Sequence, residues 1–338
     1  MPYQIPSVGQ FLNIKRLQTT QTVEKSLDLK KFRIPTGYGS VQGFYTKFGA
    51  NALLSNKFII PPEAAINLGP GGTIQASVTA TSSVIITQIV FIGTLTINWG
   101  DDIIETFNSN ILSGSSFSHN YATSSTYLIS VSIAVGYGYI TSFDVSDCTP
   151  LTTIGCVGNI NLSSLNVANT RATSITASSC NLSTIANLDS IKTYLVTLNL
   201  RRNPIVSLNL NGYSALTVLN IENTTNNSLT SLVLQNCQSL LRIFAINNAN
   251  LQVLDLRVNT PAVNTLTIRG CTNLATLYIG GTQLNAINTI GTNTSPTLNP
   301  LIVGTVTMTN TQASVYPGND PAAYYASALP LWTFIVAP

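Results

Sequence analysis

A six-residue apolar pattern recurs along the second half of this chain and limits what the chain can fold into. From Ile205 onward it reads L-x-x-L-x-L, with other residues replacing Leu at some positions, and a short polar turn follows. Successive units start 10 to 13 residues apart. The eight units open at Ile205, Leu216, Leu229, Leu240, Leu251, Val263, Leu274 and Leu284. A repeat this short and regular indicates a stack of small units.

The spacing within each unit indicates strands. The fourth and sixth positions are two residues apart, so in a strand both side chains point to the same side. The first position enters from the preceding turn and completes an apolar triad. One unit alone has nothing against which to bury its triad, whereas stacked units share a core. Two units make a coil of about 22 residues, near the lower end for leucine-rich repeats. We therefore predict a β-solenoid over residues 141–290, with short parallel strands on one face, strand-like or irregular segments on the other, and no helices.

The rest of the chain has a different pattern. Residues 61–140 alternate β-branched residues with Gly, Ser and Asn punctuation, which is typical of a β-sandwich. Strands are expected at 74–80, 83–92, 94–99, 103–107, 116–120 and 127–133. Residues 1–60 have no clear period, and residues 291–338 become aromatic and proline-bearing, as a C-terminal cap or assembly segment would. The predicted fold class is all-β, a sandwich followed by a leucine-rich-repeat solenoid.

The composition is poor in charge. Charged residues make up 8% of the chain, against about 25% in an ordinary soluble domain. Asn, Thr and Ser take their place, as in extracellular fibres, adhesins and virus shells. Few cytosolic enzymes have so little charge.

The charge is also unevenly distributed. Residues 1–60 hold eight basic and two acidic residues, and the remainder holds seven basic and ten acidic ones. The basic residues form no dense block and lack interleaved aromatic residues, which disfavours nucleic acid as a partner. We predict that residues 1–60 are a basic anchoring arm that docks onto another protein of the same virion or surface assembly. A merely solvated basic face is the alternative.

No targeting or membrane segment is expected. The opening MPYQIP lacks the basic start and continuous apolar stretch of a secretory signal. The most apolar segment, residues 84–99, is β-branched and too short to cross a bilayer as a helix.

Three short motifs together resemble the PKD-like immunoglobulin sandwich. They are TLTINWGDD at residues 94–102, FSHNY at 117–121 and STYLISV at 125–131. Asp102 and Ser125 stand where that family usually has glycine. The resemblance implies a binding or scaffolding domain in which Trp99, Tyr127 and His119 have structural roles.

The repeats are similar to the short Leu/Asn/Cys-type leucine-rich repeats of Bacteroidetes surface proteins and their phages. Three of the five cysteines lie three residues before the next leucine, in the turn position that this family gives to Asn or Cys. These are Cys148, Cys237 and Cys271. An odd cysteine count without a CxxC pair argues against a metal site and a disulfide framework.

We find no constellation of residues for catalysis. His119 is the only histidine, so Ser-His-Asp and Cys-His arrangements are limited to a position that the PKD-like motif already explains. The adjacent Asp101 and Asp102 lack the further oxygen ligands that calcium needs. Asp189, Glu222 and Asp255 fall on different coils. We expect no catalytic, cofactor or metal site, and therefore no enzyme.

The fifth and seventh positions of each unit are expected to point outward. Alternate units then form two columns, one on each face of the solenoid. One column combines an aromatic residue with cations, the residue types that dominate binding hot spots. The candidate partner-binding face is Arg242, Phe244, Ile246 and Arg269. Burial of Phe244 and Ile246 beneath the C-terminal segment is the alternative.

These observations favour a non-enzymatic structural protein of a phage virion. We expect a spike, fibre or decoration subunit on the virion surface that displays the repeats for attachment to a host receptor of unknown identity. Such a subunit would be a homo-oligomer within its assembly. The alternative is a bacterial cell-surface adhesin or another protein-binding repeat protein.

Overall fold

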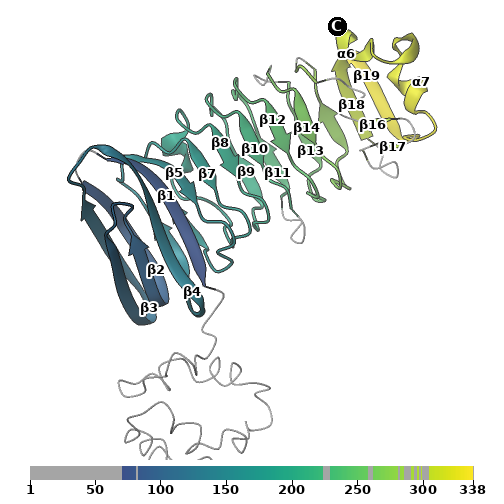
Figure 1. Ribbon diagram of the computed structural model, residues 1–338. Coiled ribbons are helices and arrows are strands. Elements are labelled where there is room, and N and C mark those ends of the chain that lie inside the picture. Colours follow the sequence, from purple (N-terminus) through teal and green to yellow (C-terminus); the bar gives the residue numbers. More distant parts are fainter. Residues whose placement is uncertain are drawn as a thin grey trace, which may run out of the picture.

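The structure, a computed structural model, is all-β, with 46% strand and 7% helix. It describes residues 71–80, 83–223, 229–257, 262–280, 282–284, 291–292, 295–296, 298 and 304–337. The predicted anchoring arm, residues 1–60, lies outside this set. The strands stack along one axis, from a group of long strands at one end to the C-terminal segment at the other (Figure 1).

Four long strands open the described chain. They are β1 (Gly72–Ala80), β2 (Ser83–Asn98), β3 (Ile104–Asn120) and β4 (Ser125–Asp144). They pair antiparallel in the order β1-β4-β2-β3. β1 buries Ile74, Ala76 and Val78 at alternate positions, as expected of a strand with one face on a core. Each strand predicted in residues 61–140 overlaps one of these four.

β2 is one bent strand rather than the two predicted. Val84, near its start, pairs with His119. Trp99, just past its end, stacks on the same His119 ring with the centroids 5.0 Å apart. A straight strand would separate Val84 from Trp99 by about 50 Å. β2 therefore folds back on itself.

Two glycines mark the bend. Gly93 of β2 faces Gly138 of β4 in register, and both have positive φ, of 105° and 144°. A Cβ on Gly138 would lie 1.8 Å from the carbonyl oxygen of Ile92. Only glycine permits so close an approach of the two backbones.

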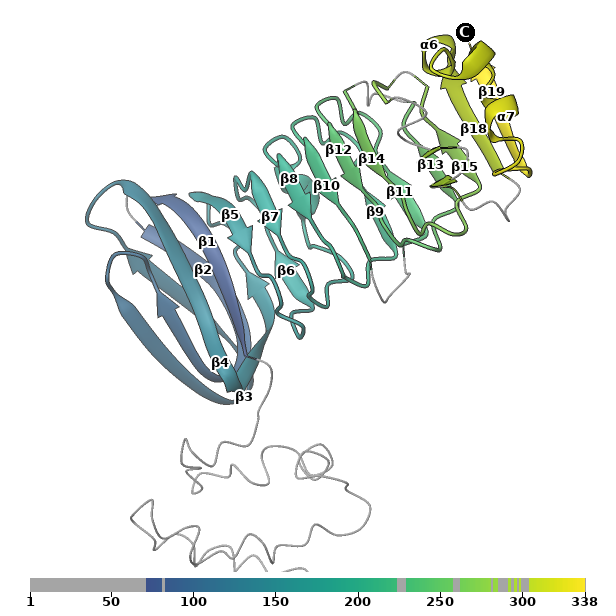
Figure 2. The same ribbon diagram turned by 45° about the vertical axis from the view of Figure 1, so that its right-hand side comes forward.

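The first strands continue directly into the solenoid. β5 (Leu151–Gly155) pairs antiparallel with β1, and β6 (Ser164–Asn166) pairs parallel with the last residues of β4. β4 runs through residue 140, where the sequence suggested a boundary between two regions. The hydrogen-bonded sheet is therefore continuous between the N-terminal strands and the coils (Figure 2).

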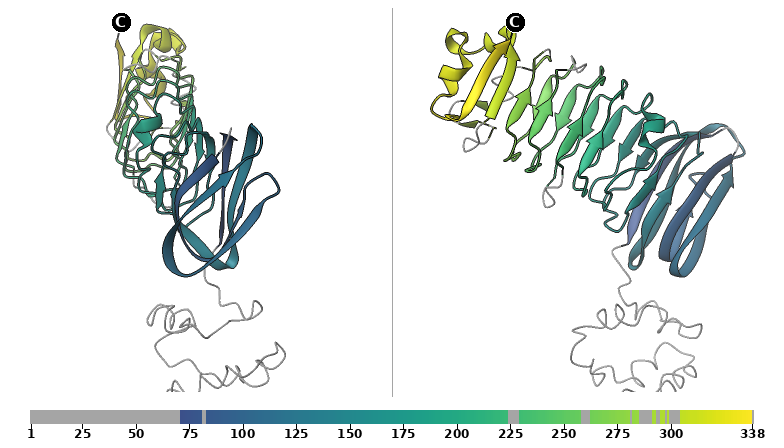
Figure 3. Two further views of the ribbon diagram at one scale, coloured as in Figure 1. Left: turned by 90° about the vertical axis from the view of Figure 1, so that its left-hand side faces the viewer. Right: turned by 180° about the vertical axis from the view of Figure 1, so that it is seen from behind.

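The β-solenoid has about six turns and carries strands on two faces. We call face A the parallel series β5, β7 (Ser174–Thr176), β8 (Thr197–Asn199), β10 (Val218–Asn220), β12 (Arg242–Phe244) and β14 (Thr265–Thr267). Face B comprises β6, β9 (Ser207–Asn209), β11 (Ser231–Val233), β13 (Val253–Asp255) and β15 (Thr276–Tyr278). The stacked strands are seen from the front in Figure 1 and from behind in the right-hand view of Figure 3.

The repeat leucines fill the core as predicted. Each face-A strand contributes one buried residue to an aligned column, and these residues pair in register between adjacent strands. These residues are Ile154, Ile175, Leu198, Leu219, Ile243 and Leu266. Short strands also occur on the second face, within the expectation of strand-like or irregular segments there. The expectation of no helices was wrong, because a 3-10 helix, η3 (Leu188–Ile191), lies within the solenoid.

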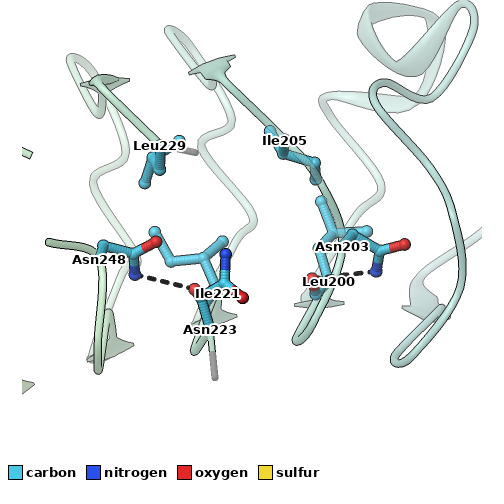
Figure 4. A pocket seen from close by; sticks show the side chains of 7 residues that line it. All are labelled: Leu200, Asn203, Ile205, Ile221, Asn223, Leu229 and Asn248. Atoms are coloured by element: carbon cyan, nitrogen blue, oxygen red, sulfur yellow. Dashed lines mark hydrogen bonds between the residues drawn. The ribbon is translucent and has the colours of Figure 1, made fainter. Parts of the chain in front are cut away.

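Buried amides and thiols at the turns hold neighbouring coils together. The Asn203 amide Nδ2 donates to the carbonyl oxygens of Ala177, at 2.6 Å, and Leu200, at 3.0 Å. Asn248 Nδ2 donates in the same way to Ile221, at 2.9 Å (Figure 4). Each buried amide therefore satisfies one carbonyl of its own turn and one of the preceding coil.

Cysteines perform the same role in other turns. Cys237 Sγ donates to the Leu210 carbonyl at 3.1 Å, as the predicted turn position requires. Cys180, which the spacing did not single out, donates to the Cys156 carbonyl at 2.8 Å. All five cysteines are buried and unpaired. Burial raises the pKa of the Cys237 thiol to about 11.

The C-terminal segment extends face B before it ends. β18 (Gly304–Thr309) pairs parallel with β15, and β19 (Trp332–Ala337) pairs parallel with β18. Between them lie α6 (Asn310–Ala313), η4 (Pro317–Asn319) and α7 (Pro321–Tyr325). A small hairpin, β16 (Gly291–Thr292) and β17 (Ser295–Pro296), precedes them.

Aromatic rings pack at this end of the stack. Tyr325 stacks on Phe334 with their centroids 5.3 Å apart, and Tyr316 and Tyr324 contact Tyr325. No helix in the described part of the chain is long and apolar enough to span a membrane.

Candidate binding faces

The pairing register aligns outward side chains into columns on face A. Asn220, Phe244 and Thr267 are register partners on β10, β12 and β14. Just beyond these strands, the backbone N–H of Asn223 donates to the Ile246 carbonyl, and the backbone N–H of Asn247 donates to the Arg269 carbonyl at 2.7 Å. These bonds fix the spacing between coils, so the outward side chains sit on a rigid backbone.

The four predicted face-A residues lie on adjacent coils, and we call them the face-A patch. Arg242 and Arg269 are exposed, and Phe244 and Ile246 are half-buried. β12 pairs with β10 and β14, whereas the C-terminal strands pair on face B. The C-terminal strands therefore do not pair with β12, the strand that carries Phe244. The alternative in which the C-terminal segment covers Phe244 finds no support in the strand pairing.

The two arginines of the patch have no acidic partner among the described residues. Glu222 is the carboxylate of the neighbouring coil, and its Oε2 lies 3.1 Å from Arg201 Nε on the far side from the patch. The described ion pairs do not include Arg242 or Arg269. The patch therefore presents two uncompensated positive charges beside an aromatic and an aliphatic side chain.

On face B, the exposed Arg257 contacts neighbouring side chains of the same face. Arg257 Nη2 lies 2.8 Å from Asp255 Oδ2, and its guanidinium lies 3.5 Å from the centroid of the Tyr278 ring. The hydrogen bonds from Arg257 lower the pKa of Asp255 below its ordinary value. Arg257 is thus paired within the protein, whereas Arg242 and Arg269 have no ion-pair partner among the described residues.

His119 and Asp101 form a local cluster with the aromatic residues of the first two sequence motifs. His119 Nε2 lies 2.7 Å from Asp101 Oδ2, and the Tyr121 hydroxyl donates to the Trp99 carbonyl at 2.7 Å. Trp99 is fully buried and Tyr127 is nearly so. No group of three or more His, Cys, Asp or Glu side chains in the described ranges could hold a metal ion.

Face B contains a cleft that the repeat pattern does not predict. The segment before η3 joins β6 through the bridge between Asn166 and Ala186. β9 pairs with β11 alone, on its other side. The face-B ladder is therefore interrupted between Ala186 and β9, both of which lie in described segments. A cleft of about 450 Å³ occupies the gap.

Two sequence features account for the gap. In the preceding coil, Asn181 stands four residues before Ile185, the centre of the face-B segment. Its backbone N–H donates to the Leu162 carbonyl at 2.9 Å. Pro204 holds the equivalent place before β9 and has no N–H to donate. In addition, Asn187 adopts φ 56° and leads the chain into η3, which takes residues away from the ladder.

The cleft has an apolar floor and a polar rim. Leu188 and Leu208 line the floor, and each is 8% exposed, like Leu266 on face A. One hydrogen bond crosses the gap, from the Tyr213 hydroxyl to Asp189 Oδ1 at 3.0 Å. Asp189, which lies on a different coil from Glu222 and Asp255, thus pairs with a tyrosine and with neither of these acids. The Asn203-Pro204 pair was the signal that could have located the cleft.

Comparison with known proteins assigns no family. No family model matches the chain, and no curated protein matches it significantly.

Proposed function

We propose that the chain is a non-enzymatic structural protein of a phage virion that displays face A for attachment to a host. The observation that carries this proposal is the face-A patch. Two arginines without an ion-pair partner among the described residues flank a half-buried phenylalanine and isoleucine, on a backbone held in register from coil to coil. Arginine and aromatic side chains on a preorganised surface are typical of binding hot spots.

The finer identity of the two regions is part of the proposal. We assign the N-terminal strands to a PKD-like immunoglobulin sandwich and the coils to short leucine-rich repeats. Support comes from the buried Trp99 and Tyr127, which the motif resemblance assigns to the core, and from turn cysteines such as Cys237. Both resemblances belong to scaffolding and binding proteins.

The proposed location is the virion surface, where the chain would be a spike, fibre or decoration subunit present in several copies. The support is compositional, namely a charged fraction of only 8% and a basic stretch at residues 1–60. In this proposal, residues 1–60 dock onto an acidic neighbouring virion protein. The receptor on the host is a molecule with acidic and apolar groups that complement the patch.

Gold-labelled antibodies against the purified chain test the location. In a culture that produces the chain, labelled phage particles with unlabelled cell surfaces are the expected result. Labelled cell surfaces without labelled particles would reject the virion proposal in favour of a bacterial adhesin. Label confined to the cell interior would reject both.

A further inference from the structure

We propose that the face-B cleft binds one ring of a neutral saccharide. The cleft lies between η3 and β9, on the face opposite the face-A patch, and involves none of the patch residues. The inference is therefore independent of the proposed attachment role of face A, and each can fail without the other.

The size and floor of the cleft suit a sugar ring. Small-molecule sites usually measure about 300–1,000 Å³. The cleft measures about 450 Å³. Polar and apolar side chains both line this cleft, which suits a ligand that has hydroxyl groups and a C–H face. Leu188 and Leu208 line the bottom of the cleft as an aliphatic floor. Such a floor can pack against the C–H face of a pyranose, because burial of that face removes apolar surface from water.

The rim supplies both kinds of hydrogen-bonding group from opposite walls. On the η3 side, Asp189 uses Oδ1 to accept from Tyr213, and Oδ2 has no partner among the described residues. On the β9 side, Asn209 uses its side-chain oxygen to accept from the Asn211 amide at 3.0 Å. Its Nδ2 donors have no partner in the described ranges. Ser207 on the same strand adds a hydroxyl.

This arrangement matches hydroxyl groups better than other ligands. A sugar hydroxyl both donates and accepts, so neighbouring hydroxyls can donate to Asp189 and accept from Asn209. A hydrogen bond to an ionised carboxylate is stronger than one between neutral groups. No Lys or Arg lines the cleft, which disfavours phosphate, sulfate and other anions. The aliphatic floor disfavours a hydrated metal ion.

Ligand-observed NMR on the full chain tests the proposal directly. The probes are the methyl glycosides of glucose, galactose, mannose and N-acetylglucosamine. Each is used at about 10 mM, above the millimolar Kd expected for a single ring in an open cleft. Inorganic phosphate and methylammonium serve as anionic and cationic comparison probes.

Two variants and one matched control locate the site. Ser207→Trp places a large side chain over the cleft and should abolish saturation transfer to the glycoside. Asp189→Asn keeps an acceptor for Tyr213 but removes the charge, and should weaken binding about tenfold. Ser231→Trp is the control, because Ser231 is the register partner of Ser207 on β11, is also exposed, and does not line the cleft. It should leave binding unchanged.

Each outcome decides the proposal. Glycoside binding that is lost in Ser207→Trp and kept in Ser231→Trp supports it. The proposal is wrong if no glycoside binds, if phosphate or methylammonium binds there instead, or if a folded Ser207→Trp variant still binds normally. Should Ser207→Trp fail to fold by circular dichroism, Asp189→Asn decides, and unweakened binding by that variant overturns the proposal.

Discussion

The buried amides predict a specific cost for removing one of them. Asn248 Nδ2 donates to the carbonyls of Ile221 and Ala245, both at 2.9 Å, and to that of Ile246 at 3.4 Å. Cys271 Sγ also donates to Ala245, so this carbonyl keeps a partner after truncation, whereas the Ile221 carbonyl loses its side-chain donor. At roughly 1 kcal/mol for each short hydrogen bond plus the penalty for an unsatisfied buried group, Asn248→Ala should reduce the free energy of unfolding by about 2–4 kcal/mol.

Urea denaturation followed by far-UV circular dichroism measures this cost. Asn248→Cys should be less harmful, at about 1 kcal/mol, because thiols fill the equivalent position in other turns, as Cys271 does. Asn273→Ala is the control, since Asn273 is exposed in a similar turn and should change stability by less than about 0.5 kcal/mol. If Asn248→Ala and Asn273→Ala cost the same, buried amides do not tie the coils together, and the reasoning fails.

The remaining predictions concern the core, the bend and the thiols. Leu254 is fully buried on face B, so Leu254→Ala should cost about 2–5 kcal/mol, and hydrogen exchange should rise in adjacent coils first; a uniform rise from Thr94 to Leu284 would contradict a solenoid of separable coils. Gly138→Ala meets the Ile92 carbonyl and should cost more than about 3 kcal/mol. Gly158→Ala, with φ +77° and open space, should cost only about 1–2 kcal/mol, and equal melting temperatures for the two would refute the close approach. The three turn thiols should react with iodoacetamide at pH 8 about 100-fold more slowly when folded than in urea, because burial raises the pKa of each to about 11 and so lowers its thiolate fraction. The three thiols are those of Cys148, Cys237 and Cys271. If mass spectrometry finds them labelled as fast in the folded protein as in urea, their burial is contradicted.

The solenoid was predictable because its information is local. Leu216, Leu219 and Ile221 form a triad within six residues, and that triad recurs at nearly constant spacing. A strand places the fourth and sixth positions on one side whatever the rest of the chain does. The structure accordingly buries Leu219 and Ile221 against their equivalents in neighbouring coils.

The bend and the cleft depend on contacts that a single pass along the sequence does not show. Gly93 and Gly138 lie 45 residues apart, and only the register of β2 against β4 brings them together. Pro204 has no N–H, so it cannot make the hydrogen bond to the preceding coil that Asn181 makes at the equivalent place. Cys180 was overlooked for a simpler reason, because it stands two residues before Leu182 rather than three.

One binding comparison decides whether face A attaches the particle to its host. Purified full chain is incubated with isolated cell envelopes from a panel of Bacteroidetes strains, the hosts that the repeat resemblance suggests. The test variant is Phe244→Ala with Arg269→Ala. The control is Val233→Ala with Arg257→Ala, which alters the fifth position of one coil and the seventh of the next on face B. We predict that the face-A variant, still folded, binds at least about tenfold more weakly than the wild-type chain, and that the face-B control binds normally. Envelope binding that the face-A change leaves intact, or no binding to any strain by the wild-type chain, would contradict the account.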